Sequence, residues 1–192
     1  MNLGSNLVAV DGPSRRATFK TADGEVTRDF AMLHVSPPQK APSVVADSAL
    51  ADEAGYVDVD PASLQHKRYL NVFAIGDVGG MPNAKTAAAV RKQAPVVAIN
   101  ALAILDREEP PAIYGGYGSC PLIVERGRVV LAEFGYGGAL QPSFPSWLND
   151  GTRPTRFGWI LKKDLMPTIY FDIMLKGREW LAQPKMRHEE RA

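Results

Sequence analysis

Cysteine is almost missing from this chain: Cys120 is the single one among 192 residues. That count excludes an intramolecular disulfide and a metal site built from thiolates alone. The three histidines (His34, His66 and His188) are scattered, without the spacing of a metal-binding pair. We therefore predict no metal site.

An excess of one charge is also missing. Lys and Arg total 22 against 21 Asp and Glu, for a net charge of +1, so we expect no nucleic-acid partner. No run reaches the roughly 18 uncharged apolar residues of a membrane-spanning helix. Residues 1–22 lack the apolar core of a signal peptide, so we expect no such leader at this start.

The composition that is present, 45% hydrophobic and 22% charged, is ordinary for a globular protein of one domain or two small ones. Turn signals at Asp11-Gly12-Pro13 and Ala22-Asp23-Gly24 divide residues 6–35 into a predicted antiparallel meander of three strands. The compact apolar run 71–75 predicts a buried parallel strand.

Two helical regions and a hairpin are predicted further on. Residues 85–105 form a helix, with Asn83 as its N-cap and a kink or break at Pro95. Residues 119–134 form a hairpin around the Arg126-Gly127 turn. Residues 157–181 form a short helix and a longer one, separated at Pro167.

The first candidate site is Ile75-Gly76-Asp77. It places a carboxylate at the carboxyl end of the predicted strand, where α/β sheets bind ligands. An aspartate there can accept two hydrogen bonds from a chain of hydroxyl groups. A Gly-Asp pair without context is more often a turn or cap, so the pair alone favours the structural role.

The other candidates also have an ordinary interpretation. A lone cysteine such as Cys120 is most often a small buried hydrophobe, and Lys85 and Lys162 are most often solvated. The apolar and aromatic tail fits either helices packed on their own domain or an interfacial membrane anchor. Basic residues within it suit anionic headgroups, and we favour the anchor (Lys162, Lys163, Lys176 and Arg178).

Several motifs in order resemble one enzyme family. Asn71-Val72-Phe73-Ala74-Ile75-Gly76-Asp77-Val78, followed by Lys85-Thr86-Ala87-Ala88-Ala89, resembles the second flavin-binding motif of two-dinucleotide-fold flavoproteins. Tyr117-Gly118-Ser119-Cys120-Pro121-Leu122 and Lys162-Lys163-Asp164-Leu165-Met166-Pro167 are similar to the carboxy-terminal region of sulfide:quinone oxidoreductases. Met32-Leu33-His34-Val35-Ser36-Pro37-Pro38 is similar to that family as well.

The resemblance implies an FAD enzyme that oxidises sulfide through a cysteine pair and passes electrons to quinone. It implies that Asp77 holds the ribitol of FAD, with the cofactor bound by Gly76, Asp77, Lys85, Thr86 and Ala87. It assigns catalysis to Cys120, Lys85 and Lys162. It implies a quinone or membrane side formed by Pro167, Ile169, Tyr170 and Phe171.

The sequence departs from the family in two respects: it has no G-x-G-x-x-G phosphate loop and no second cysteine. We therefore expect the carboxy-terminal portion of such an enzyme, which needs the missing amino-terminal half or an oligomeric partner. The expected fold is α/β and α+β. Its parts are a remainder of a nucleotide-binding-like domain (1–70), the last strand and helix of the FAD domain (71–111) and a carboxy-terminal domain (112–192).

We expect peripheral attachment to a membrane, the bacterial inner membrane in the first instance. Two alternatives stay open. One is another flavoenzyme, such as a type II NADH:quinone dehydrogenase or a flavocytochrome sulfide dehydrogenase, although Ser-Cys-Pro around Cys120 favours the sulfide branch. The other is a membrane-associated module that is catalytically incomplete.

Overall fold

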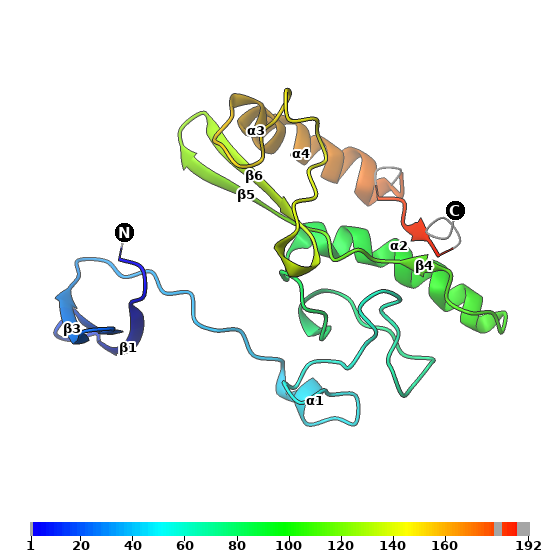
Figure 1. The fold of residues 1–192 in the computed structure, drawn as a ribbon, viewed down its shortest axis with the longest axis horizontal. Helices are drawn as coiled ribbons and strands as arrows, with labels where there is room; N and C mark the ends of the chain where they lie inside the picture. The colour runs from blue at the N-terminus through cyan, green and yellow to red at the C-terminus, as the bar shows by residue number, and fades with distance from the viewer. Residues whose placement is uncertain (1, 179–181, 188–192) are drawn as a thin grey trace. The chain divides into compact units, whose positions relative to one another are not determined.

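The computed structural model describes residues 2–178 and 182–187. The chain divides into two compact units, Met1–Gln39 and Lys40–Ala192, which are described separately. The first unit is an antiparallel sheet of three strands in sequence order, β1 (Asn6–Asp11), β2 (Arg16–Thr21) and β3 (Gly24–Asp29). The predicted meander is confirmed, with a third strand that ends at Asp29 (Figure 1).

The second unit combines one long helix, two small antiparallel sheets and a helical tail (Figure 1). The sheets pair β4 (Ala112–Ile113) with β7 (Lys185–Met186) and β5 (Gly118–Glu125) with β6 (Arg128–Phe134). The expected hairpin is confirmed in β5 and β6. In chain order the elements are α1 (Ser43–Ala46), η1 (Gly76–Val78), α2 (Ala87–Leu105), β4 (Ala112–Ile113), β5 (Gly118–Glu125), β6 (Arg128–Phe134), η2 (Tyr136–Gly138), α3 (Arg156–Ile160), η3 (Leu161–Leu165), α4 (Met166–Thr168), η4 (Ile169–Ile173), η5 (Met174–Lys176) and β7 (Lys185–Met186).

The strand predicted at 71–75 does not form. The segment has one isolated antiparallel bridge, between Gln65 and Phe73, and runs into the η1 turn. A parallel strand needs a parallel neighbour to complete its ladder of hydrogen bonds. Among the described residues, the named strands of this unit form antiparallel pairs only, so this apolar run has no ladder to join.

Helix α2 begins at a different cap from the expected one. The Oγ1 atom of Thr86 accepts the N–H of Ala89 at 3.2 Å, whereas the side chain of Asn83 donates to the Tyr114 hydroxyl at 2.7 Å. The helix continues through Pro95 without a break. One proline removes a single backbone bond, and packing of the turns on either side compensates for that loss.

By its length and composition, helix α2 is also apolar enough to cross a membrane. Core helices meet the same criterion, so this is weak evidence for a span. The helix is not an uncharged apolar run, because it contains Arg91 and Lys92. Five of its side chains are buried in the unit: Ala89, Gln93, Val96, Asn100 and Ala103.

The tail is one continuous right-handed helical segment from α3 to η5, so the expected separation at Pro167 is wrong. Two wide π-helical stretches, η3 and η4, lie on either side of α4. Pairing from i to i+5 moves the carbonyl that would otherwise meet the proline ring, which explains why Pro167 is tolerated. The end of the predicted helix, residues 179–181, lies outside the described residues.

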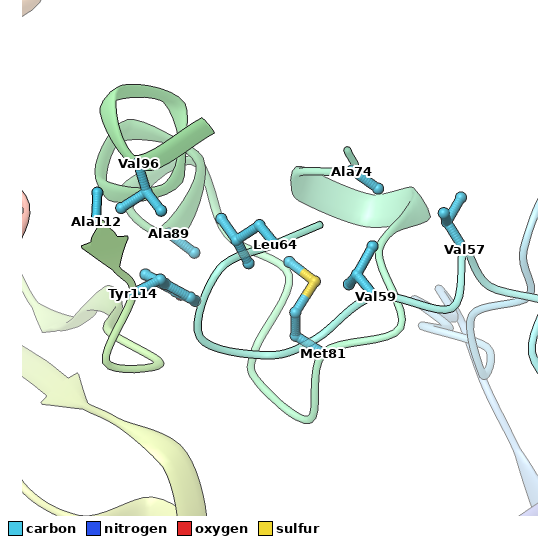
Figure 2. Close-up of a cluster of buried hydrophobic side chains, with 9 residues drawn as sticks. All are labelled: Val57, Val59, Leu64, Ala74, Met81, Ala89, Val96, Ala112 and Tyr114. Atoms are coloured by element: carbon cyan, nitrogen blue, oxygen red, sulfur yellow. The ribbon is translucent and has the colours of Figure 1, made fainter. Parts of the chain in front are cut away.

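The core of this unit lies between α2 and the irregular segment before it (Figure 2). Leu64 is fully buried at its centre, and Val96 reaches it from the helix. The side chain of Asn100 fastens this arrangement, because it donates to the carbonyls of Ser63 and Ala112 and accepts the N–H of Ala112. The apolar members are Val57, Val59, Leu64, Ala74, Met81, Ala89, Val96, Ala112 and Tyr114.

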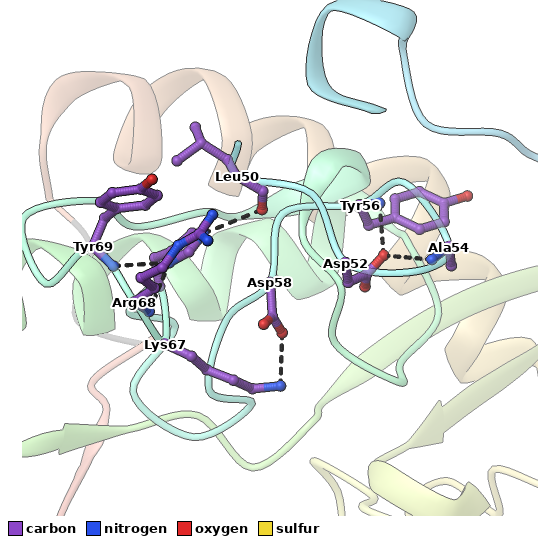
Figure 3. Close-up of polar contacts among 9 residues, drawn as sticks. Leu50, Asp52, Ala54, Tyr56, Asp58, Lys67, Arg68 and Tyr69 are labelled. Atoms are coloured by element: carbon purple, nitrogen blue, oxygen red, sulfur yellow. Dashed lines mark hydrogen bonds and ion pairs between the residues drawn. The ribbon is translucent and has the colours of Figure 1, made fainter. Parts of the chain in front are cut away.

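Residues 49–69 form an irregular segment that is fixed by polar contacts and not by helices or strands (Figure 3). The buried ring of His66 accepts the N–H groups of Arg68 and Tyr69 at Nδ1 and donates from Nε2 to the carbonyl of Leu50. Asp52 accepts the N–H groups of Ala54 and Tyr56, both at 2.9 Å. This segment is thereby ordered enough to pack against the start of α2.

Candidate functional site

The Gly76-Asp77 turn is held against helix α2. Gly76 has a φ of 68°, a conformation that only glycine adopts without strain. Its N–H donates to the side-chain oxygen of Gln93 at 2.8 Å, and a Cβ at Gly76 would lie 3.2 Å from the Val90 side chain. The turn therefore requires glycine and leaves the carboxylate of Asp77 exposed.

Lys85 lies half-buried near this turn. Its ammonium group donates to the carbonyl of Gly79 at 2.6 Å and stands 4.3 Å from the centre of the Tyr56 ring. Burial lowers the pKa of Lys85 below its usual 10.5, while the charges of Asp77 and Asp52 act in the opposite direction. The group is thus a cation in a partly dry setting, close enough to Asp77 to feel its charge.

Thr86 and Ala87 form the amino end of α2, directly after Lys85. The N–H groups of a first helical turn have no partner within the helix, and the helix dipole favours negative charge there. The five residues expected at a cofactor gather at this end of α2: Gly76, Asp77, Lys85, Thr86 and Ala87.

Cys120 is exposed on β5, opposite Ala132 of β6. It is therefore not the buried hydrophobe that its residue type favours. Alternate residues of a strand share a face, so Cys120 lies on the same face as Gly118. A Cβ at Gly118 would lie 3.7 Å from the Ala84 side chain, just before Lys85. The start of β5 at Gly118 thus lies beside the segment that leads into α2, while Cys120 itself is exposed.

Lys162 occupies a different place from Lys85. Its ammonium group donates to the carbonyl of Pro121 at 2.7 Å and so meets the backbone next to Cys120. The structure therefore brings Lys162 to the cysteine strand, and brings Lys85 to the Asp77 turn.

The tail exposes much of its apolar surface. Tyr170 is 46% and Phe171 61% exposed, Pro167 is exposed, and Ile169 is half-buried. Further exposed apolar side chains on the same helical segment are Ile160, Leu165 and Leu175. Exposed apolar side chains in this number suit a lipid or protein surface.

The structure contains a buried polar cluster around Glu133 that the sequence did not predict. Glu133 is 5% exposed and accepts hydrogen bonds from the Tyr117 hydroxyl at 2.6 Å and from both the N–H and the hydroxyl of Ser143. Burial, followed by the hydrogen bond to Glu133, raises the pKa of Tyr117 to about 12. The alternation of residues along β6 could have indicated that Glu133 is buried, because Glu133 lies on the same inward face as Val129 and Leu131.

The residues present fit one end of a flavin. An exposed carboxylate suits the hydroxyls of the ribityl chain, and a helix amino end beside a lysine suits the electron-rich side of the ring. The chain has no glycine-rich loop for the pyrophosphate. Within residues 2–178 and 182–187, no group of three or more His, Cys, Asp and Glu side chains is arranged to hold a metal ion.

Comparison with known proteins gives close relatives. Mitochondrial sulfide:quinone oxidoreductases of Dictyostelium discoideum and Mus musculus are each 41% identical to this chain over 92% of its length, and that of Schizosaccharomyces pombe is 39% identical over 94%. No family model matches. The resemblance to sulfide:quinone oxidoreductases is confirmed, and the chain spans 39% to 40% of the length of these relatives.

A solved structure shares the fold. A chain in the cryo-EM structure of the Tetrahymena thermophila mitochondrial ATP synthase matches with a TM-score of 0.69 at 25% identity. The match covers 86% of this chain and 40% of that one.

Proposed function

We propose that this chain is the carboxy-terminal portion of an FAD-dependent sulfide:quinone oxidoreductase. The observation that carries the proposal is the closeness of two segments: a Cβ on Gly118, two residues before Cys120, would lie 3.7 Å from the Ala84 side chain, directly before Lys85. The strand that carries the thiol therefore starts beside the segment that carries Lys85. A thiol held near a flavin-binding cluster is what a thiol-to-flavin reaction needs.

FAD, when bound, supplies a two-electron acceptor. Asp77 would accept hydrogen bonds from its ribityl hydroxyls. The amino end of α2, with Thr86 and Ala87, favours negative charge on the ring, and Lys85 adds a cation beside it. Lys162 holds the backbone next to Cys120 and limits where that thiol lies.

Cys120 supplies one of the two sulfur atoms that the reaction requires. Attack of HS⁻ on a disulfide breaks the S–S bond, forms a persulfide on one cysteine and releases the other as a thiolate. This chain has a single cysteine, so a second one would have to be supplied from outside it. The isolated chain is therefore expected to bind flavin without oxidising sulfide.

The exposed apolar tail supports peripheral attachment to a membrane, where a lipid-soluble quinone is found. Pro167, Ile169, Tyr170 and Phe171 remain the proposed quinone or membrane side. The relatives are mitochondrial by name. Attachment to a bacterial inner membrane remains a prediction.

Riboflavin and FAD, titrated separately and followed by flavin fluorescence, test the flavin site. The chain offers candidate binding residues only for the ribityl chain and ring, which FAD and riboflavin share. We therefore expect the affinities for FAD and riboflavin to agree within about threefold. Asp77→Ala should weaken both. The matched control is Asp106→Ala, since Asp106 lies at the other end of α2.

Two outcomes contradict parts of the proposal. Failure of both flavins to bind, or an equal loss in the two variants, would overturn the site at Asp77. FAD that binds far more tightly than riboflavin and survives desalting would show that the chain completes the site by itself.

A further inference from the structure

Helix α2 carries two buried side-chain amides, which have different hydrogen-bond partners. Gln93 is 1% exposed and Asn100 is fully buried, two turns further along. Among the described residues, Asn100 bonds to backbone groups of Ser63 and Ala112, neither of which is a proposed flavin residue. Gln93 instead bonds to Gly76, the residue before Asp77.

The contact at Gly76 has two points. The side-chain oxygen of Gln93 accepts the Gly76 N–H at 2.8 Å, and Val90, one turn earlier on α2, lies against the open side of the glycine. A glycine at φ 68° has many alternatives in solution, so these two contacts select the conformation. The direction of the exposed Asp77 carboxylate is thereby tied to α2.

Gln93 also lies near the segment that leads to the cysteine. It acts on the pKa of Tyr114 in the direction opposite to burial, and the amide of Asn83 donates to the Tyr114 hydroxyl at 2.7 Å. The Tyr114 hydroxyl donates in turn to the carbonyl of Tyr117 at 2.5 Å. The hydroxyl of this buried tyrosine thus accepts one hydrogen bond and donates another. Tyr117 directly precedes β5, three residues before Cys120.

We infer that Gln93 is a positioning residue, which fixes the Asp77 turn on helix α2 through its hydrogen bond to Gly76. Its relevance to catalysis rests on the proposed function. The contacts themselves do not, and they can be tested without flavin.

The test compares Gln93→Met with Asn100→Met. Both replace a buried amide on the same helix by an apolar side chain. Hydrogen exchange of the Gly76 amide is measured against that of Ala74, whose N–H donates to the carbonyl of Leu64 in the same core. In Gln93→Met we expect protection of Gly76 to fall about fivefold more than that of Ala74, the value of one lost hydrogen bond. In Asn100→Met both amides should lose protection together.

Riboflavin affinity gives the second readout. It should fall at least about fivefold in Gln93→Met and stay close to wild type in folded Asn100→Met. If Gln93→Met does not fold, Gln93→Asn serves, because its carbonyl is one methylene too short to reach Gly76.

The outcomes separate the two proposals. Unchanged protection of Gly76 in the Gln93 variants, or equal selective loss in Asn100→Met, overturns the positioning role. Wild-type protein that binds no riboflavin overturns the flavin site, yet leaves the exchange result to decide the role of Gln93. Normal riboflavin binding by a Gln93 variant that has lost Gly76 protection overturns the link between the two.

Discussion

The ammonium group of Lys162 donates to the carbonyl of Pro121 across 2.7 Å and joins the helical tail to the strand residue next to Cys120. The two residues are 41 positions apart. A long-range contact of this kind sets how the hairpin and the tail lie against each other.

Replacement of Lys162 tests that contact. Lys162→Met should lower the free energy of unfolding by about 1 kcal/mol, because the Pro121 carbonyl loses a charged donor in a half-buried place. Lys163→Met is the control, since Lys163 makes an exposed ion pair with Asp164 at 3.5 Å, and the expected change is below about 0.5 kcal/mol. Urea unfolding measures both. Equal losses would contradict a special role for Lys162.

The Gly76 turn is tested against a glycine of the same conformation. Gly137 has a φ of 66° with no atom within 4 Å of an added Cβ, whereas Gly76 faces Val90. Gly137→Ala should cost about 1 kcal/mol of unfolding free energy, from backbone strain alone. Gly76→Ala should cost at least about 2 kcal/mol, because the added methyl also crowds Val90. Similar costs, measured by urea unfolding, would mean that helix α2 does not clamp this turn.

The lowered pKa of Lys85 predicts that the free energy of unfolding depends on pH in the alkaline range. Since burial lowers its pKa in the folded chain, the unfolded chain holds more protons between that lowered pKa and 10.5. The stability linked to this group therefore rises with pH across that window. The difference in unfolding free energy between wild type and Lys85→Met should move in favour of the wild type as the pH approaches 10.5. A flat difference, or one that moves the other way, contradicts the prediction.

Tyr117 predicts the opposite trend. With a folded pKa of about 12, it keeps a proton that the unfolded chain loses above about 10, so its contribution to stability falls as the pH rises between these values. At neutral pH, Tyr117→Phe should cost about 1–3 kcal/mol, because buried Glu133 loses a donor. Tyr170→Phe, at an exposed tyrosine, should change little. Thermal or urea unfolding at neutral and alkaline pH separates the two effects.

The exposed tail predicts binding to lipid. Phe171→Asp should weaken binding to vesicles that contain anionic lipid by about tenfold, since a large apolar side chain no longer enters the interface. Val44→Asp is the control, because Val44 is 80% exposed in α1, outside the tail. Sedimentation with vesicles measures both. An equal effect of the two changes would argue against a membrane surface on the tail.

Local signals predicted the elements that depend on local contacts. The meander and the β5–β6 hairpin follow from turn residues flanked by strand-forming residues, and both form. The strand at 71–75 failed, because a parallel strand depends on neighbours distant in sequence. Asn83 was misplaced as a cap for a related reason: a distant hydroxyl, that of Tyr114, takes its side chain.

The motifs of the sequence by themselves determined the family resemblance, the glycine before Asp77 and the set of candidate residues around the flavin, because these depend on residue identity and spacing. Only the tertiary structure decided which candidates meet. It placed Lys85 near Asp77 and Lys162 beside the cysteine strand, and it revealed Gln93, Tyr114 and Glu133 as buried polar links. The physical reason is that a buried polar group takes whichever partner the fold brings within hydrogen-bonding distance, and that partner is seldom a neighbour in sequence.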